Sequence, residues 1–106
     1  MSQAEARYAD LCEEFLRRSE VSQDGKGFGS SSLKVDGRIF AMLSSRGEFV
    51  VKLPRQRVDA LVAAGEGVHY DAGRGRPMKE WLALNADSAL DWSTLAEEAL
   101  AFVKVA

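Results

Sequence analysis

The sequence predicts an α+β domain, in which helices flank a largely antiparallel sheet of about five strands in the order αβββαββα. Three observations favour this class. Amphipathic stretches lie near both ends of the chain, an Asp-Gly pair joins two apolar stretches, and a proline opens a further helix-like stretch. The length of 106 residues is that of one domain, so we expect residues 1–106 to form a single unit.

The first predicted element is a helix over residues 2–20. Its apolar side chains recur every three or four positions, which is the spacing of one buried helical stripe. They are Ala4, Tyr8, Leu11, Cys12, Phe15 and Leu16. We expect Cys12 to be a buried core residue, because a reactive thiol needs an electropositive and partly exposed setting. Serine, aspartate and three glycines in residues 21–29 then end the helix.

Three strands should follow as an antiparallel meander over residues 33–35, 38–43 and 48–53. Asp36-Gly37 joins the first two strands, and both residues tolerate the positive φ of a two-residue type I′ turn. Such a turn predicts that Phe40 and Met42 share one face with the apolar residues of the first strand. Ile39, Ala41 and Leu43 would then line the opposite face.

The second half of the chain predicts a helix, two strands and a closing helix. Pro54 suits a helix start and Gly65 suits a helix end. Strands are expected over residues 68–71 and 78–84, followed by a helix over residues 95–106. The N-cap of that helix is one of three residues, namely Ser88, Asp91 or Ser93. Trp92, just before the helix, is expected to pack in the core and fix its entry angle.

The composition is typical of a folded globular protein, with 46% hydrophobic and 28% charged residues. A net charge of −2 and a pI near 5.4 give no overall attraction to nucleic acid or to anionic membranes. The early acidic residues are unlike a signal peptide, so we expect a cytoplasmic protein with no membrane partner. One cysteine and one histidine predict no metal site and no cofactor.

Two motifs resemble catalytic or nucleotide-binding sites only superficially. The glycines of residues 25–29 lack the preceding strand and following helix that a phosphate-binding loop requires, so a flexible connection is the better interpretation. His69 could act as a base with Asp71 as its orienter and a serine of residues 30–32 as nucleophile. Nothing in the sequence brings these residues together, and we therefore predict a surface histidine and no catalytic residues.

Basic residues gather in two segments although the overall charge is slightly negative. Residues 46–57 contain four basic side chains and one acidic one, and residues 74–79 contain three basic side chains and no acid. If the segments meet in space, they form an anion-binding patch. The candidate contact residues are Arg46, Arg55, Arg57, Arg74, Arg76 and Lys79. Alternatively, these cations are scattered solvating charges or pair with the four acids of residues 87–98.

Trp81 lies in the strand expected over residues 78–84, and the position of its side chain there has two interpretations. It alternates with Lys79 and Ala83, so it is either part of the core of a sheet covered on both faces or an exposed anchor for a partner, and we favour the core. The linear sequence does not interleave aromatic residues with the basic clusters, which disfavours DNA binding.

Several of these motifs, taken in order, resemble a known family. Gly27-Phe28-Gly29 precedes the Asp36-Gly37 hairpin, whose second strand contains Phe40-Ala41, and Arg76-Pro77-Met78 opens a later strand. This arrangement resembles the N-terminal domain of the TfoX (Sxy) competence-regulator family, with its F-G pair, D-G turn and R-P-M strand. The stretches 50–54 and 92–102 are also similar to the neighbouring YjbR/MmcQ group, often labelled DNA-binding.

The resemblance covers roughly residues 25–103 and implies a small, non-enzymatic domain that takes part in regulating competence or transcription. It brings no catalytic residues. We therefore expect a TfoX N-terminal-like regulatory or protein-binding module that acts through a protein partner. The alternative is a DNA-binding protein of the YjbR/MmcQ type that contacts phosphates through the same basic residues.

Overall fold

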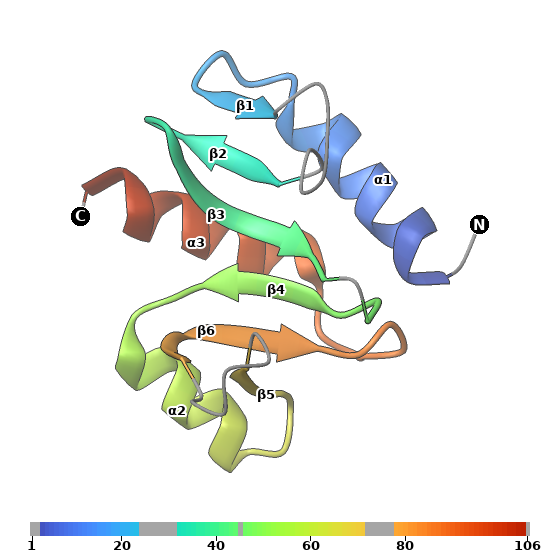
Figure 1. The fold of residues 1–106 in the computed structure, drawn as a ribbon, viewed down its shortest axis with the longest axis vertical. Helices are drawn as coiled ribbons and strands as arrows, with labels where there is room; N and C mark the ends of the chain where they lie inside the picture. The colour runs from blue at the N-terminus through green and yellow to red at the C-terminus, as the bar shows by residue number, and fades with distance from the viewer. Residues whose placement is uncertain (1–2, 24–31, 45, 72–77, 106) are drawn as a thin grey trace.

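The structure, a computed structural model, describes residues 3–23, 32–44, 46–71 and 78–105. These residues confirm the predicted α+β class, because three helices flank one antiparallel sheet of six strands (Figure 1). The elements are α1 (Gln3–Phe15), β1 (Val21–Gln23), β2 (Leu33–Val35), β3 (Arg38–Leu43), β4 (Phe49–Lys52), α2 (Arg55–Ala63), β5 (Val68–Tyr70), β6 (Met78–Leu84) and α3 (Trp92–Val105). Across the sheet the order is β1-β2-β3-β4-β6-β5, which leaves β1 and β5 at the two edges.

Strand β1 is the one element that the sequence pattern does not predict. It pairs with β2 in an antiparallel register, with Val21 opposite Val35 and Gln23 opposite Leu33. Three residues are too few to show a strand period, and the segment lies where polar residues and glycines end the first helix. The tertiary pairing with β2 therefore decides its conformation.

One face of the sheet packs against all three helices and forms the core (Figure 1). Buried side chains of α1, α2 and α3 belong to the same cluster as residues from β2, β3, β4 and β6. Within it Phe49 stacks on Trp92 with ring centroids 4.5 Å apart, and Tyr8 lies 6.2 Å from Phe49 on the same centroid measure. Cys12 is also buried, so the predictions that Cys12 and Trp92 are core residues are confirmed.

The Asp36-Gly37 turn forms as predicted, with φ of 53° and 77°, values in the left-handed region that a type I′ turn requires. The predicted faces of β3 are wrong, however. A bulge shifts the register so that Leu33 pairs with Ala41 while Lys34 pairs with Ile39. The extra residue, Phe40, therefore shares the core face with Ala41 instead of opposing it.

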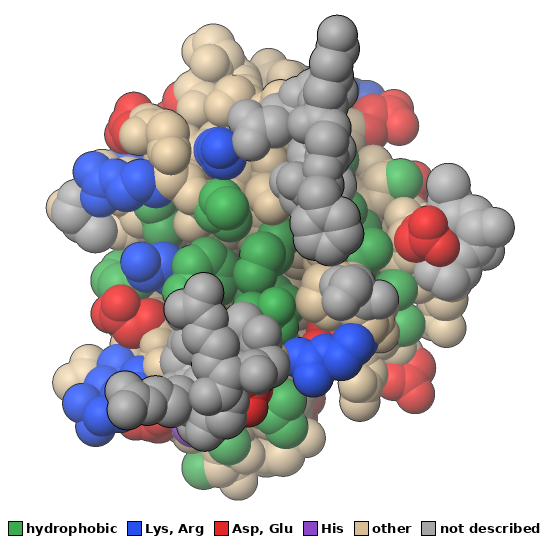
Figure 2. All heavy atoms as spheres, in the orientation of Figure 1, with side chains coloured by type: hydrophobic (Ala, Val, Ile, Leu, Met, Phe, Trp, Pro, Cys, Tyr) green, Lys and Arg blue, Asp and Glu red, His purple; other side chains and the backbone are tan. Residues whose placement is uncertain are grey.

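The bulge also turns Met42 to the opposite face of the sheet. Met42 pairs with Val50, Val50 with Ala83, and Ala83 with Val68, so the four side chains form a row across β3, β4, β6 and β5. None of the four belongs to the core cluster beneath the helices. Figure 2 shows this face, with apolar side chains gathered near its middle and Lys or Arg side chains around them.

Helix α2 begins and ends where the sequence predicts. The carbonyl of Pro54 accepts hydrogen bonds from the amides of Arg57 and Val58, which starts the helix. Gly65, with φ of 76°, follows the last turn in the left-handed conformation, and its amide donates to the carbonyl of Val62. This helix covers β5 and β6 and positions Arg55 beside the start of β6.

Helix α3 is capped by Asp91, which selects one of the three predicted N-caps. One Asp91 carboxylate oxygen accepts a hydrogen bond from the Ser93 amide, 3.3 Å away, and the other from the Thr94 hydroxyl, 2.7 Å away. These bonds and the positive end of the helix favour the charged carboxylate, with the Thr94 bond as the largest cause, so they lower the pKa of Asp91.

Arg7 of α1 fastens the loop that leads from β6 into α3. Its guanidinium donates to the carbonyls of Ala86, Ser88 and Leu90 over 2.9 to 3.1 Å. The same guanidinium carbon lies 4.1 Å from the centroid of the Trp92 ring. Arg7 thereby joins the first helix, the last loop and the aromatic core.

Candidate functional site

The structure brings together two of the six predicted contact residues. Arg55, at the first position of α2, and Lys79, near the start of β6, line the same hollows on the surface. Their proximity follows from the pairing of β4 with β6, because Lys52 lies opposite Trp81 and the chain enters α2 just beyond Lys52. Arg74 and Arg76 lie outside the described residues.

Arg57 and Arg46 take other partners and leave the predicted patch. The Arg57 guanidinium donates to both carboxylate oxygens of Glu98 on α3, at 3.0 and 3.2 Å, which is the pairing with the acidic closing helix considered as an alternative above. Arg46 lies in the β3–β4 turn, at the other end of β4 from Arg55. Its guanidinium contacts Glu48 at 3.2 Å and donates to the carbonyl of Asp71 at 2.7 Å.

Trp81 lies at the centre of a surface that the linear sequence does not reveal. Lys52 Nζ is 5.7 Å from the centroid of its ring, a distance at which a cation is attracted to the aromatic face. Trp81 lies opposite Lys52 and next to the core-facing Leu82, so it points to the sheet face away from the helices. Lys79 lies two positions before Trp81 on β6. We call Lys52, Arg55, Lys79 and Trp81 the cationic surface.

A hollow of about 470 Å³ opens beside Trp81. Its lining consists of Arg55, Lys79, Glu80 and Trp81, and we call it the Trp81 hollow. Trp81 is partly exposed, whereas Arg55 and Lys79 are exposed. The indole is therefore partly accessible beside two cations, and the favoured prediction that Trp81 is a core residue is wrong.

A second hollow, of about 330 Å³, shares Arg55 and Lys79 with the first. Its other lining residues are Asp59 of α2 and His69 of β5, and we call it the His69 hollow. His69 Nε2 lies 3.0 Å from Asp59 Oδ1, and Arg55 Nε lies 3.9 Å from the other Asp59 oxygen. The histidine thus pairs with Asp59, because α2 packs against β5.

A catalytic role for His69 finds no support in this geometry. The described residues that line the His69 hollow include no serine, threonine or cysteine that could serve as nucleophile. Ser32, the described member of the candidate serines, is buried with 4% of its surface exposed. Ser30 and Ser31 lie outside the described residues.

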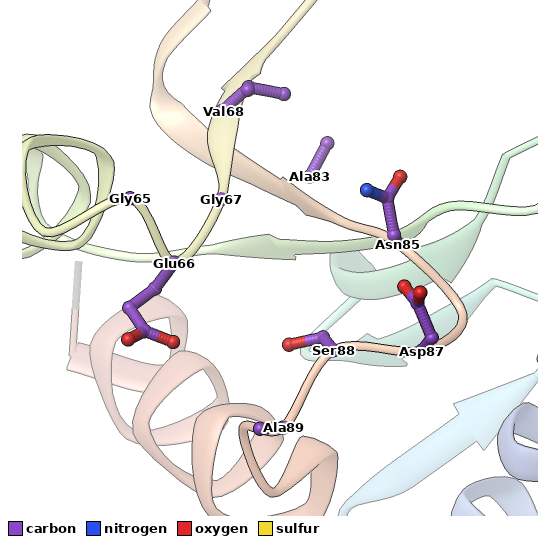
Figure 3. Close-up of a pocket in the computed structure, with 9 residues that line it drawn as sticks. All are labelled: Gly65, Glu66, Gly67, Val68, Ala83, Asn85, Asp87, Ser88 and Ala89. Carbon is purple, nitrogen blue, oxygen red and sulfur yellow. The ribbon is translucent and has the colours of Figure 1, made fainter.

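A third hollow, of about 320 Å³, lies at the β5 edge of the sheet (Figure 3). Figure 3 shows Glu66 entering from one side, with Asn85, Asp87 and Ser88 on the other side. Its two carboxylates have no cation beside them in the lining. This hollow is therefore polar and acidic, in contrast to the cationic surface.

Cys12 and Tyr8 form a buried polar contact within the core. The Cys12 sulfur lies 3.4 Å from the Gln23 side-chain nitrogen, and burial raises the pKa of its thiol. Burial, together with the neighbouring Cys12, also raises the pKa of Tyr8. Both groups are therefore held in their neutral forms, as in a structural cluster.

Among the residues that the structure describes, no helix is long and apolar enough to cross a membrane, and no three acidic, histidine or cysteine side chains are placed to hold a metal ion. Comparison with protein-family models, curated proteins and solved structures finds no match to this chain. The resemblance to TfoX N-terminal domains therefore stays a prediction that depends on the sequence motifs alone.

Proposed function

We propose that this chain is a non-catalytic, regulatory protein-binding module whose cationic surface docks an acidic segment of a protein partner. The observation that carries the proposal is the accessible Trp81 ring with Lys52 5.7 Å from its centroid and with Arg55 and Lys79 in the same hollow. Tryptophan and arginine at the centre of a contact contribute much of the binding energy of protein interfaces.

The chemistry of the partner follows from the charges around the indole. Three cations surround Trp81, while Glu80 is the one acid that lines its hollow. A partner segment that carries glutamate or aspartate beside an apolar side chain would pair with the cations and cover the indole. Val68, at the β5 end of the apolar row on the same face, is 55% exposed and offers further contact area, whereas Val50 and Ala83 in that row are buried.

The resemblance to TfoX N-terminal domains supports the proposal, because it implies a regulatory module that acts without catalysis. A module of this kind needs only a surface of matched shape and charge, and its specificity arises from charge placement around an apolar anchor.

Charge reversal tests the proposal directly. The probe is a synthetic peptide of alternating glutamate and leucine, labelled at one end and titrated with the full chain in fluorescence anisotropy. We expect Arg55→Glu and Lys79→Glu each to weaken binding about tenfold or more, because each replaces attraction by repulsion at the contact. Arg17→Glu is the matched control: Arg17 is an exposed cation in the turn after α1 that pairs with Glu13, and its reversal should change the affinity less than about twofold.

Two outcomes of the peptide titration would contradict the proposal. If all three reversals change binding equally, the attraction is a property of the whole protein and not of the cationic surface. If Trp81→Ala leaves the affinity unchanged, the indole is no anchor. Either result rejects the proposed docking surface.

DNA binding is the second candidate, and the neighbouring positions of Trp81 and Lys52 favour a single strand over a duplex. Bases stack on accessible aromatic rings while cations contact the phosphates. The net charge of −2 and the carboxylates of Glu80 and Asp59 at the two hollows disfavour the binding of a long polyanion. An oligothymidine strand in place of the peptide, titrated at rising salt, separates the candidates, because several phosphate contacts make affinity fall steeply with salt.

A further inference from the structure

The His69 hollow gathers nitrogen donors from three elements around one space. Arg55 comes from α2, His69 from β5 and Lys79 from β6, and the three side chains line a hollow of about 330 Å³. They are far apart in the sequence and meet because α2 packs on both β5 and β6. Arginine offers a planar fork of donors, lysine a point charge and histidine a further N–H, which together suit an oxyanion.

Asp59 is the one carboxylate beside the cations Arg55 and Lys79 among the described residues that line this hollow. Asp59 contacts His69 at 3.0 Å and Arg55 at 3.9 Å, and the second contact is at the outer limit of an ion pair. Lys79 has no ion-pair partner among the residues that the structure describes. Among the described residues of this hollow, two permanent cations therefore face a single anion.

We propose that the His69 hollow binds a phosphate monoester, carried by the partner as a phosphorylated side chain. This inference rests on the proposed function, because the partner segment that docks on the cationic surface brings the phosphate to the adjoining hollow. A phosphate monoester carries a charge of about −1.5 to −2 and three acceptor oxygens, enough for Arg55, His69 and Lys79 at once. A carboxylate has one charge and two oxygens, and a DNA phosphodiester has one charge.

When the partner is absent, the Asp59 carboxylate contacts the donors that the phosphate would bind. Its carboxylate keeps His69 and Arg55 oriented toward the hollow, at the contacts of 3.0 and 3.9 Å. An incoming phosphate competes with this carboxylate for the same donors and is repelled by its charge. Removing the charge while keeping the shape, as in Asp59→Asn, should therefore strengthen phosphate binding.

Two peptides that differ by one phosphate test this inference. Both alternate glutamate and leucine around a central serine, which is unmodified in one and phosphorylated in the other, and both are titrated with the full chain. We expect the phosphopeptide to bind about tenfold more tightly, a typical gain for charge-assisted hydrogen bonds. The readout is the ratio of the two affinities, because this ratio cancels contacts that both peptides make.

Variants then assign the phosphate preference to the hollow. Arg55→Gln and Lys79→Gln should reduce the ratio to less than about threefold, while Asp59→Asn should raise it. Lys52→Gln is the matched control, because Lys52 belongs to the cationic surface but does not line the His69 hollow. It should weaken both peptides alike and leave the ratio unchanged.

The outcomes separate this inference from the proposed function. Equal affinity for the two peptides overturns the phosphate site and leaves the docking surface in place. If neither peptide binds, the proposed function fails, and with it a phosphate delivered by a protein partner. The inference is also overturned, in favour of nucleic acid, if an unmodified DNA duplex binds more tightly than the phosphopeptide and Lys79→Gln weakens the binding of that duplex.

Discussion

Lys52 and Trp81 lie directly opposite each other on β4 and β6, with the lysine nitrogen 5.7 Å from the centroid of the indole ring. This pair joins a cation from the first basic segment to an aromatic residue from a distant strand. Arg55 and Lys79 extend it at the point where β4 leads into α2 and β6 begins. The only prominent cluster of cations beside an accessible aromatic ring, within the described residues, is thus a product of strand pairing.

Quenching of tryptophan fluorescence tests the electrostatics of this surface. Trp81 is partly exposed beside three cations, whereas Trp92 is buried with 3% of its surface exposed. Iodide should therefore quench the accessible emission more strongly than caesium does, because the cations concentrate anions near Trp81. In the Lys52→Glu, Lys79→Glu double variant the preference for iodide should disappear. Equal quenching by both ions in the unmodified protein would contradict the described surroundings of Trp81.

Replacing Arg7 by alanine should lower the free energy of unfolding by about 2–3 kcal/mol, measured by urea titration. The variant leaves the carbonyls of Ala86, Ser88 and Leu90 without their charged donor and uncovers one face of Trp92. Arg17→Ala, in the turn just after the same helix, is the control, with an expected loss below about 0.5 kcal/mol, because its ion pair with Glu13 is exposed. A similar loss in both variants would show that Arg7 does not fasten the loop.

Gly67 should not tolerate alanine. A Cβ at this position would lie 2.8 and 2.9 Å from side-chain carbons of Leu84 and Leu82, and 3.0 Å from the backbone oxygen of Ala83. The overpacking should cost about 1–3 kcal/mol of the free energy of unfolding. Because β5 is an edge strand, amide hydrogen exchange in Val68 and His69 should also accelerate. Unchanged stability would mean that the strand approaches β6 less closely than described.

Loss of the Asp91 cap should destabilise the protein in a pH-dependent way. Asp91→Ala removes the bonds to Ser93 and Thr94 and should cost about 1 kcal/mol at neutral pH. The pKa of Asp91 is lowered in the folded state, so its stabilisation is present above the ordinary aspartate pKa of about 3.9 and is lost as the pH falls further. Urea titrations at neutral and acidic pH should therefore show the two proteins converging in acid. A constant difference would contradict the charged cap.

Local sequence chemistry predicts much of the fold. The Asp36-Gly37 turn, Pro54 and Gly65 each require a particular backbone conformation, and each stands where the structure places a turn or a helix end. The helical spacing of the first and last segments likewise predicts buried stripes that the core largely contains, but Leu16 lies just beyond the end of α1 and is 40% exposed. The bulge at Phe40 carries no comparable signal, because it depends on how β2 and β3 fit against the helices.

The candidate site is less predictable because it depends on which charges meet. Arg55 and Arg57 belong to the same basic segment, yet a helix turns Arg57 toward Glu98 and leaves Arg55 beside Lys79. Trp81 alternates correctly for a strand, but alternation does not say which face of β6 the helices cover. The contact of His69 with Asp59 likewise depends on the packing of α2 against β5.

A heteronuclear NMR titration of the full chain with the glutamate–leucine peptide tests the central claim most directly. The account predicts that the largest shifts occur at Lys52, Arg55, Lys79 and the Trp81 indole N–H, with no comparable shifts along α1 or α3. Shifts centred on α1 or α3, or on the acidic hollow of Glu66 and Asp87, would place the binding site elsewhere and contradict the account.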